Sequence, residues 1–141
     1  MRYRVVAVGR VKDAALRAAC DEYLGRVRRY ARVDECEVKD EARVLGAVPA
    51  GARLVALSRG GQAWSSRDLA ERTAQWDQEG RSVAIAIGGA TALPPDVLGA
   101  AQDIWSLSTL TLPHELARVL LYEQLYRAFT IRRGEPYHRG P

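Results

Sequence analysis

The chain has 141 residues with a formal net charge of +4, and 48% of its residues are apolar and 27% charged. This composition is typical of one soluble globular domain and excludes a disordered, collagen-like or fibrous chain. The longest apolar runs, at residues 5–8 and 83–87, are too short for a secretory signal or a membrane span. We therefore expect a cytoplasmic protein with no membrane partner.

The first half of the chain alternates between strand-like and helix-like patterns. We predict, in chain order, a buried strand at residues 4–9, a helix at 13–30, a half-exposed strand at 33–38, a short connection at 40–51, a buried strand at 53–57 and turns at 58–61. Four arginines of the predicted helix, Arg17, Arg26, Arg28 and Arg29, lie off its apolar stripe. This helix is therefore expected to carry a basic face.

The second half continues the alternation, with Asp68 in capping-box position to Ser65. We predict a helix that begins at Ser65, a strand at residues 82–87, a helix at 95–102, a short strand from Trp105 that runs into an irregular loop, a long helix at 113–129 and a basic tail at 130–141. The long helix is apolar almost all round, so we expect it to be buried on more than one side, as at a subunit interface. The whole pattern predicts a single α/β domain over residues 1–141 with a mostly parallel sheet.

Positive charge is concentrated at the two ends of the sequence. Residues 1–43 carry a net charge of +3 and residues 114–141 a net charge of +2, whereas the middle carries −1. A basic surface favours nucleic acid, although a solvated face without a partner fits the same count.

Cysteine and histidine are scarce. Cys20 and Cys36 are isolated thiols, and His114 and His138 complete no recognisable ligand set with them. We therefore expect no metal, and a cytoplasmic setting disfavours a disulfide.

Three segments are candidates for chemistry. Gly88 and Gly89 follow a strong strand, where a ligand can approach the backbone closely, but an ordinary tight turn explains two glycines as well. In the loop at residues 107–113, backbone groups and leucines are suited to hold a purine ring, and a plain surface loop is the alternative. His138 is a candidate for proton transfer near neutral pH, although tails are often mobile and functionless.

Taken together, these segments indicate a protein family far more specifically than any one segment does. Residues 105–139 read WSLSTLTLPHELARVLLYEQLYRAFTIRRGEPYHR and closely resemble the C-terminal region of the RlmH family. The N-terminal VAVGR, the following DEYL, the WSSRDLA segment and the AIGG turn also occur in the family's order. Members of this family are small methyltransferases that modify N3 of a pseudouridine in large-subunit ribosomal RNA.

The resemblance implies a SPOUT-type α/β fold, with a mostly parallel sheet flanked by helices and a C-terminal deep trefoil knot, and a homodimer. It also implies S-adenosylmethionine as the methyl donor, without a metal. The donor would contact the loops that match Leu57, Gly88, Gly89, Leu107, Ser108, Thr109, Leu110, Thr111 and Leu112.

The resemblance further implies a ribosomal RNA substrate, with the assembled ribosome as the expected form. The matching tail residues, Tyr137, His138 and Arg139, would lie by the active site at the dimer interface. We hypothesise that His138 helps to remove or receive the N3 proton, while Tyr137 and Arg139 hold the nucleotide. The candidates for phosphate binding are Arg133, Arg28 and Arg29.

Some positions depart from the family pattern. Ala92 stands where a third glycine is usual, Ser58 where an acidic residue is common, Gln62 where lysine is usual, and the region at residues 40–51 is shorter. These departures bear on donor and RNA affinity.

A non-catalytic RNA-binding SPOUT protein and a SPOUT methyltransferase with another RNA target are the alternatives. The sequence leaves open the proton acceptor and the choice between a free subunit and an assembled ribosome.

Overall fold

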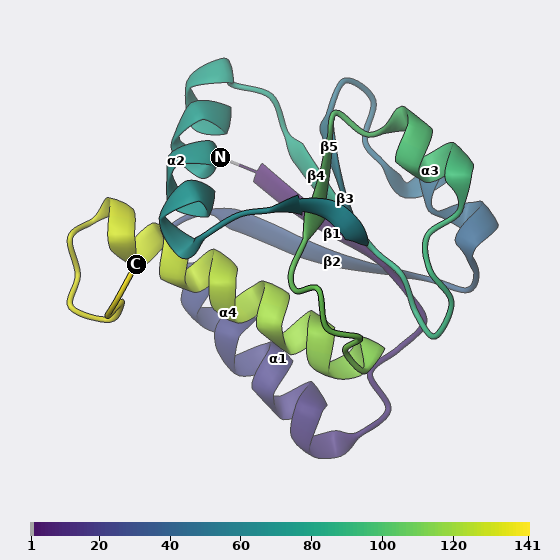
Figure 1. Ribbon diagram of the computed structural model, residues 1–141, viewed down its shortest axis with the longest axis horizontal. Coiled ribbons are helices and arrows are strands. Elements are labelled where there is room, and N and C mark those ends of the chain that lie inside the picture. Colours follow the sequence, from purple (N-terminus) through teal and green to yellow (C-terminus); the bar gives the residue numbers. More distant parts are fainter. Residues whose placement is uncertain (1) are drawn as a thin grey trace.

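A single five-stranded sheet organises the computed structural model, which describes residues 2–141. Its strands are Arg2–Val8 (β1), Arg32–Val38 (β2), Arg53–Ala63 (β3), Val83–Ile87 (β4) and Asp103–Ser106 (β5). The helices are Ala14–Val27 (α1), Ser66–Glu79 (α2), Pro95–Ala100 (α3) and His114–Arg132 (α4), with short 3-10 turns at Glu41–Arg43 (η1) and Leu45–Ala47 (η2). All strand pairs are parallel, in the order β2-β1-β4-β3-β5 (Figure 1), which confirms the predicted class.

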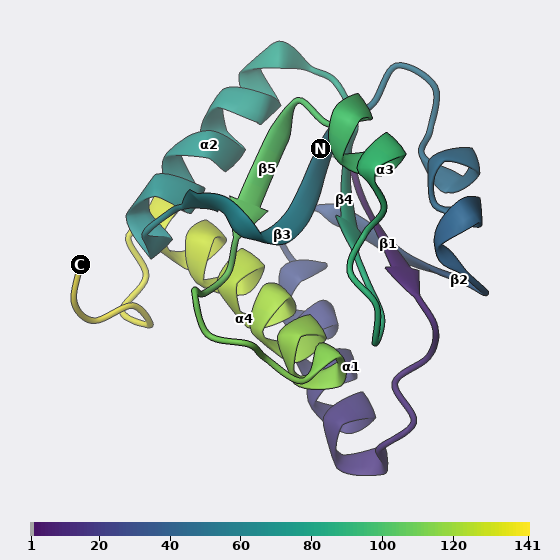
Figure 2. The same cartoon turned by 45° about the vertical axis from the view of Figure 1, so that its right-hand side comes forward.

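Helices cover both faces of the sheet. α1, α2 and α4 lie on one face, and α3 with the two 3-10 turns lies on the other (Figure 2). Because successive side chains of a strand point to opposite faces, Val5 and Ile85 enter the core beneath α1, α2 and α4, whereas Val6 and Ala84 enter the core beneath α3. The strand β4 is covered on both sides, and all five of its residues are buried, as its continuous apolar run predicts.

Neighbouring elements of the same chain cover several sides of the helix α4. It packs against α1 and α2 and against the sheet, and it buries Leu121, Tyr122 and Leu125. The expectation that the last helix is buried on more than one side is therefore confirmed. On two of these sides the covering elements are α1 and α2 of the same chain.

The prediction of turns at residues 58–61 is wrong, because β3 continues to Ala63. Leu57 and Gln62 are both registered with Trp105 of β5, so the residues between them bulge out of the ladder. The pairing that produces this bulge joins segments some forty residues apart, and no local pattern contains it.

Gly61 makes the bulge possible. A Cβ at this position would lie 2.6 Å from the carbonyl oxygen of Ile104, so only glycine lets the two backbones approach this closely. The partner strand β5 also begins earlier than predicted, at Asp103 instead of Trp105.

The remaining differences concern element ends and one connection. α1 ends at Val27 and α3 at Ala100, both earlier than predicted, and α4 continues to Arg132. The connection at residues 40–51 contains η1 and η2, and it buries Val44 in the core beneath α3. The capping box that opens α2 is confirmed by reciprocal hydrogen bonds between its two side chains and backbone N–H groups.

Candidate functional site

Three segments at the carboxyl edge of the sheet line a pocket of about 500 Å³. One segment is the bulge of β3 after Leu57, one is the loop after Ile87 in β4, and the third is the loop at residues 107–112 between β5 and α4. Open α/β sheets bind ligands at this edge, where the loops leave the strands. The residues that were predicted to contact the donor and that line this pocket are Leu57, Gly88, Gly89, Leu107, Ser108, Leu110, Thr111 and Leu112. Thr109 belongs to the same loop but is not among the lining residues.

Gly88 and Gly89 bring the loop after β4 very close to other backbone. A Cβ on Gly88 would lie 2.8 Å from the carbonyl oxygen of Thr91, and a Cβ on Gly89 would lie 2.9 Å from that of Val8. Neither position accepts a side chain without a backbone shift. An ordinary tight turn does not require the second contact, which joins the loop to the end of β1.

Local hydrogen bonds shape the loop at residues 107–112. The hydroxyl of Ser106 donates to the carbonyl of Ser108 at 3.0 Å, and the hydroxyl of Ser108 accepts from the N–H of Leu110 at 3.0 Å. The guanidinium of Arg59 donates to the hydroxyl of Thr111 and so ties the loop to the bulge of β3. The side chain of Leu110, which lines the pocket, is 71% exposed. The loop thus offers leucine side chains together with backbone groups, the combination that a purine ring needs.

Several lining residues were not predicted from the sequence, among them Arg59, Thr91, Leu93 and His114. Arg59 reaches the pocket only because of the bulge in β3. His114 follows directly after the predicted loop and begins α4. Its position next to Pro113 is the one feature of the sequence that could have placed it at the pocket.

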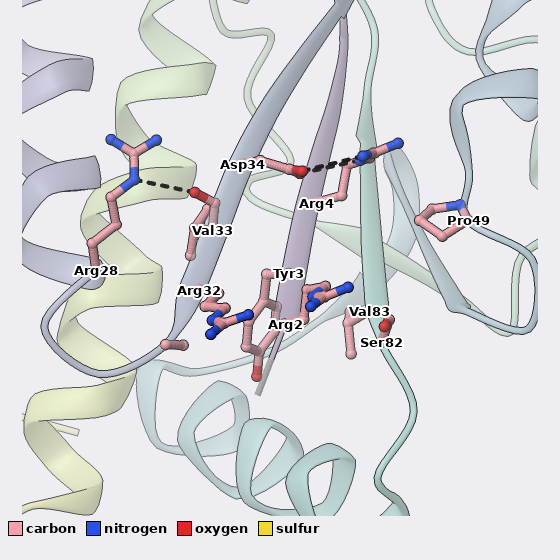
Figure 3. Close-up of a pocket in the computed structure, with 11 residues that line it drawn as sticks. Arg2, Tyr3, Arg4, Arg28, Arg32, Val33, Asp34, Pro49, Ser82 and Val83 are labelled. Carbon is pink, nitrogen blue, oxygen red and sulfur yellow. Dashed lines mark hydrogen bonds and ion pairs between the residues drawn. The ribbon is translucent and has the colours of Figure 1, made fainter.

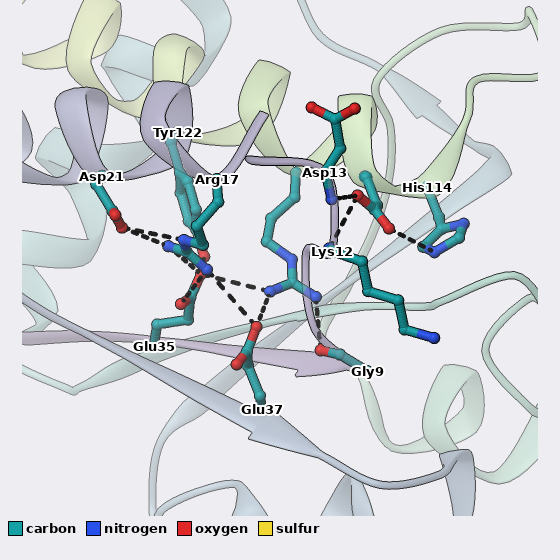
Figure 4. Close-up of polar contacts among 11 residues, drawn as sticks. Gly9, Lys12, Asp13, Arg17, Asp21, Glu35, Glu37, His114 and Tyr122 are labelled. Atoms are coloured by element: carbon teal, nitrogen blue, oxygen red, sulfur yellow. Dashed lines mark hydrogen bonds and ion pairs between the residues drawn. The ribbon is translucent and has the colours of Figure 1, made fainter. Parts of the chain in front are cut away.

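A buried arginine joins α4 to the turn after β1. Arg118, whose side chain is 3% exposed, donates to the carbonyl of Gly9 at 2.8 Å and pairs with Glu37 of β2. Figure 4 shows Gly9 and Glu37 together with Tyr122 and Glu35. The hydroxyl of Tyr122 donates to Glu35 on the same strand. Burial and this carboxylate raise the pKa of Tyr122. The network anchors the pocket end of α4 to β1 and β2.

Glu115 continues this attachment. Its carboxylate accepts hydrogen bonds from the backbone N–H groups of Lys12 and Asp13, at 3.1 and 3.0 Å. These two bonds lower the pKa of Glu115 because they favour its charged form. The segment between β1 and α1 is therefore held against the first turn of α4.

The tail folds back onto the other half of α4. The hydroxyl of Tyr137 donates to Glu123 Oε2 at 2.8 Å, and Arg127 donates to the same oxygen at 2.8 Å. Burial and the hydrogen bond to Glu123 raise the pKa of Tyr137. Arg127 Nη1 also lies 3.0 Å from His138 Nδ1. A guanidinium only donates, so Nδ1 accepts, and the ring proton is on Nε2, which donates to the carbonyl of Gly140 at 2.7 Å.

The loop at residues 107–112, which lines the pocket, and the tail lie at opposite ends of α4 (Figure 1). His114 lines the pocket and Arg127 contacts the tail. Thirteen residues of α-helix separate them, which corresponds to about 20 Å at ~1.5 Å per residue. None of the described tail residues lines the pocket. One chain therefore does not bring the predicted catalytic residues to the predicted donor pocket.

Known proteins resemble this chain over almost its whole length. Residues 1–138 match the family described as "Predicted SPOUT methyltransferase". The ribosomal RNA large subunit methyltransferase H of Sorangium cellulosum is 55% identical over 143 residues, which cover 97% of this chain and 99% of that protein. The protein of the same name from Anaeromyxobacter sp. is 41% identical over 153 residues, which cover 99% and 100%. The chain belongs to the RlmH family of SPOUT methyltransferases.

Solved structures agree on the fold of this SPOUT family member. A probable methylase family protein from Haemophilus influenzae Rd KW20 superposes with a TM-score of 0.60 at 13% identity, covering 98% of this chain and 70% of that chain. A probable methyltransferase from Bordetella pertussis Tohama I gives a TM-score of 0.55 at 16% identity, covering 90% and 95%. At these identities the likeness supports the fold alone.

In this SPOUT methyltransferase, the arginines predicted to form a basic face on α1 keep an unpaired charge only at the end of the helix. Arg17 pairs with Glu35 at 2.9 Å, and Arg26 pairs with Glu22 at 2.9 Å, so neither charge is free. The predicted phosphate-binding residues that remain exposed are Arg28, Arg29 and Arg133.

Neither a metal site nor a membrane span is present in the part of the chain that the structure describes. Residues 2–141 contain no group of three or more histidine, cysteine or acidic side chains placed to hold a metal ion. None of their helices is long and apolar enough to cross a membrane.

Proposed function

We propose that this chain transfers a methyl group from S-adenosylmethionine to N3 of a pseudouridine in large-subunit ribosomal RNA, in the cytoplasm. The observation that carries the proposal is the 55% identity, over 97% of the chain, to a protein named ribosomal RNA large subunit methyltransferase H. The LTLPH and EPYHR motifs, which resemble those of the family, support the same target atom.

The pocket fits the proposed donor. A volume of about 500 Å³ is within the usual range for cofactor sites. Leu57, Leu107 and Leu112 supply apolar walls, and the loop of Gly88 exposes backbone to the cavity. S-adenosylmethionine supplies an electrophilic methyl group on its sulfonium, so the protein must mainly hold the two reactants in line. We also propose that the loops at residues 88–93 and 107–112 belong to a trefoil knot, which is supported by the way both wall one pocket.

The proposed active unit is a homodimer in which the tail of one chain serves the pocket of the other. The separation of about 20 Å along α4 supports this arrangement. Two α4 helices that cross antiparallel about a two-fold axis would place the tail end of one beside the pocket end of the other. Leu116 is 37% exposed and Leu120 is half-buried one turn further on, so α4 keeps an apolar stripe for such a contact.

In this site the tail residues hold the nucleotide and move a proton. His138 Nδ1 is the unprotonated ring nitrogen and accepts from Arg127, and it would receive the N3 proton once Arg127 turns from it to the substrate. Tyr137, anchored to Glu123, and the exposed Arg139 would orient the target nucleotide.

The test is methyl transfer to ribosomes that lack the modification, with the methylated nucleotide mapped by mass spectrometry. We expect His138→Ala to lose turnover while binding S-adenosylmethionine normally in calorimetry, and the exposed control Lys39→Ala to keep both. Full turnover by His138→Ala would remove its proposed role. Methyl incorporation at another nucleotide would overturn the target, and no donor binding with or without ribosomes would favour the non-catalytic alternative. A monomer mass in gel filtration would contradict the composite site.

A further inference from the structure

At the amino edge of the sheet, the region around the starts of β1 and β2 carries many arginines and few carboxylates. Two shallow clefts, of about 540 and 650 Å³, adjoin there and share Arg2, Arg28 and Arg32. Figure 3 shows the residues that line the first of these clefts. Among the described lining residues are six arginines and one acidic residue, Asp34. Asp34 already accepts two hydrogen bonds from Arg4, each 3.1 Å long. We call the other five, Arg2, Arg28, Arg29, Arg32 and Arg81, the arginine edge.

Arg2 and Arg32 stand directly opposite each other at the start of β1 and β2. Neighbouring strands lie about 4.8 Å apart, and like charges placed opposite one another destabilise a sheet. Both side chains are exposed, so the core does not require them. Arg17 and Arg26, in contrast, each have a carboxylate partner. The facing pair of Arg2 and Arg32 destabilises the sheet and contributes nothing to the core. We therefore take it to indicate a ligand of opposite charge.

Backbone contacts orient other members of the arginine edge. Arg28 Nε donates to the carbonyl of Val33 at 3.1 Å, and Arg81 Nε donates to the carbonyl of Gly51 at 3.0 Å. A guanidinium held through Nε is fixed in position, and in Arg28 its terminal nitrogens form a fork that matches the geometry of a phosphate group. In Arg81 one terminal nitrogen, Nη2, also donates to the carbonyl of Ala52 at 3.3 Å, so the other terminal nitrogen is the one left for a ligand.

The arginine edge is continuous with the tail. Tyr30 lines one of the clefts, and its hydroxyl donates to Glu135 at 2.8 Å. The guanidinium carbon of Arg133 lies 5.1 Å from the centre of the Tyr30 ring. In the proposed dimer, a tail that reaches the partner's pocket therefore brings its own arginine edge to the same side of the assembly.

We propose that the arginine edge binds backbone phosphates of the ribosomal RNA next to the target nucleotide. The inference rests on the proposed function and deepens it, because it adds Arg2, Arg32 and Arg81 to the arginines that the sequence assigns to RNA. The clefts are shallow and lie side by side, so they suit a chain of phosphates better than one enclosed anion. Such contacts position the RNA without reading its sequence.

The test compares Arg2→Gln/Arg32→Gln with Lys39→Gln/Arg43→Gln, which removes two exposed charges just beyond the opposite end of β2. Binding of each variant to unmodified ribosomes is measured between about 0.05 and 0.2 M salt. For two lost phosphate contacts we expect the Kd at about 0.15 M salt to rise roughly 10- to 30-fold, and the slope of log K against log salt to fall by about 1.4 to 1.8. The KM for ribosomes should rise in parallel, with kcat and donor affinity unchanged.

Thermal stability distinguishes a binding role from a structural one. Removing two facing like charges should leave the Tm unchanged or raise it. A fall in Tm, or a Kd and salt slope equal to those of the control pair, would overturn the inference. Because ribosome binding is measured without turnover, failure of the wild-type protein to methylate would refute the proposed function separately.

Discussion

Replacing Arg118 by alanine should destabilise the fold by about 3 kcal/mol. Removing one partner of a buried ion pair costs roughly 3–5 kcal/mol. Arg17 still lies 2.9 Å from Glu35 and 3.6 Å from Glu37, and the Glu37 side chain is 27% exposed, so the lower end of this range applies. The lost hydrogen bond to the Gly9 carbonyl is part of this cost. For a chain of this length, the loss corresponds to a fall in Tm of roughly 10 °C.

The assay is urea and thermal unfolding of the variant, followed by circular dichroism. Arg67→Ala, which removes an exposed arginine of α2, is the matched control and should change stability by less than about 0.5 kcal/mol. Because Gly9 adjoins Val8, which touches Gly89, we also expect weaker donor binding by the Arg118 variant. A loss of stability below about 1 kcal/mol would refute the reasoning, since the network would then be no stronger than a surface ion pair.

Three further substitutions test other parts of the site. Gly88→Ala places a Cβ 2.8 Å from the Thr91 carbonyl, and calorimetry should find donor affinity at least about tenfold lower, or ~1.4 kcal/mol, whereas Gly99→Ala, with open space around it, should bind normally. Glu115→Ala should lower the Tm at neutral pH. Because the folded-state pKa of Glu115 lies below its ordinary value of 4.5, the difference in Tm between variant and wild type should shrink as the pH falls below 4.5. A difference in Tm that stays constant across a pH series of melts would contradict this. Tyr137→Phe removes a hydrogen bond to a carboxylate and should slow methyl transfer with a stability loss of only about 1 kcal/mol; unchanged turnover would argue against a role for the anchored tail.

Structural features that depend on local patterns are predictable from this sequence, and features that depend on contacts between distant segments are not. The strand Val83–Ile87 and the helix start at Ser65 were predictable because their patterns are local and agree with burial. The bulge that brings Arg59 to the pocket was not, because it depends on pairing with β5. The neutralisation of Arg17 depends likewise on Glu35 of another element. Eight of the nine residues that the family resemblance assigns to the donor line one pocket, although they come from three separate segments of the chain.

The length of α4 has a consequence for mixtures of variants. If each site combines the pocket of one chain with the tail of the other, a Gly88→Ala chain and a His138→Ala chain spoil different halves of a site. A heterodimer of the two would then hold one site with both halves intact and one with both halves damaged. At a donor concentration too low to saturate the Gly88→Ala pocket, mixing the two preparations should raise methyl transfer above that of either one alone once their subunits exchange. This rescue requires a helix that keeps the pocket and the tail of one chain apart.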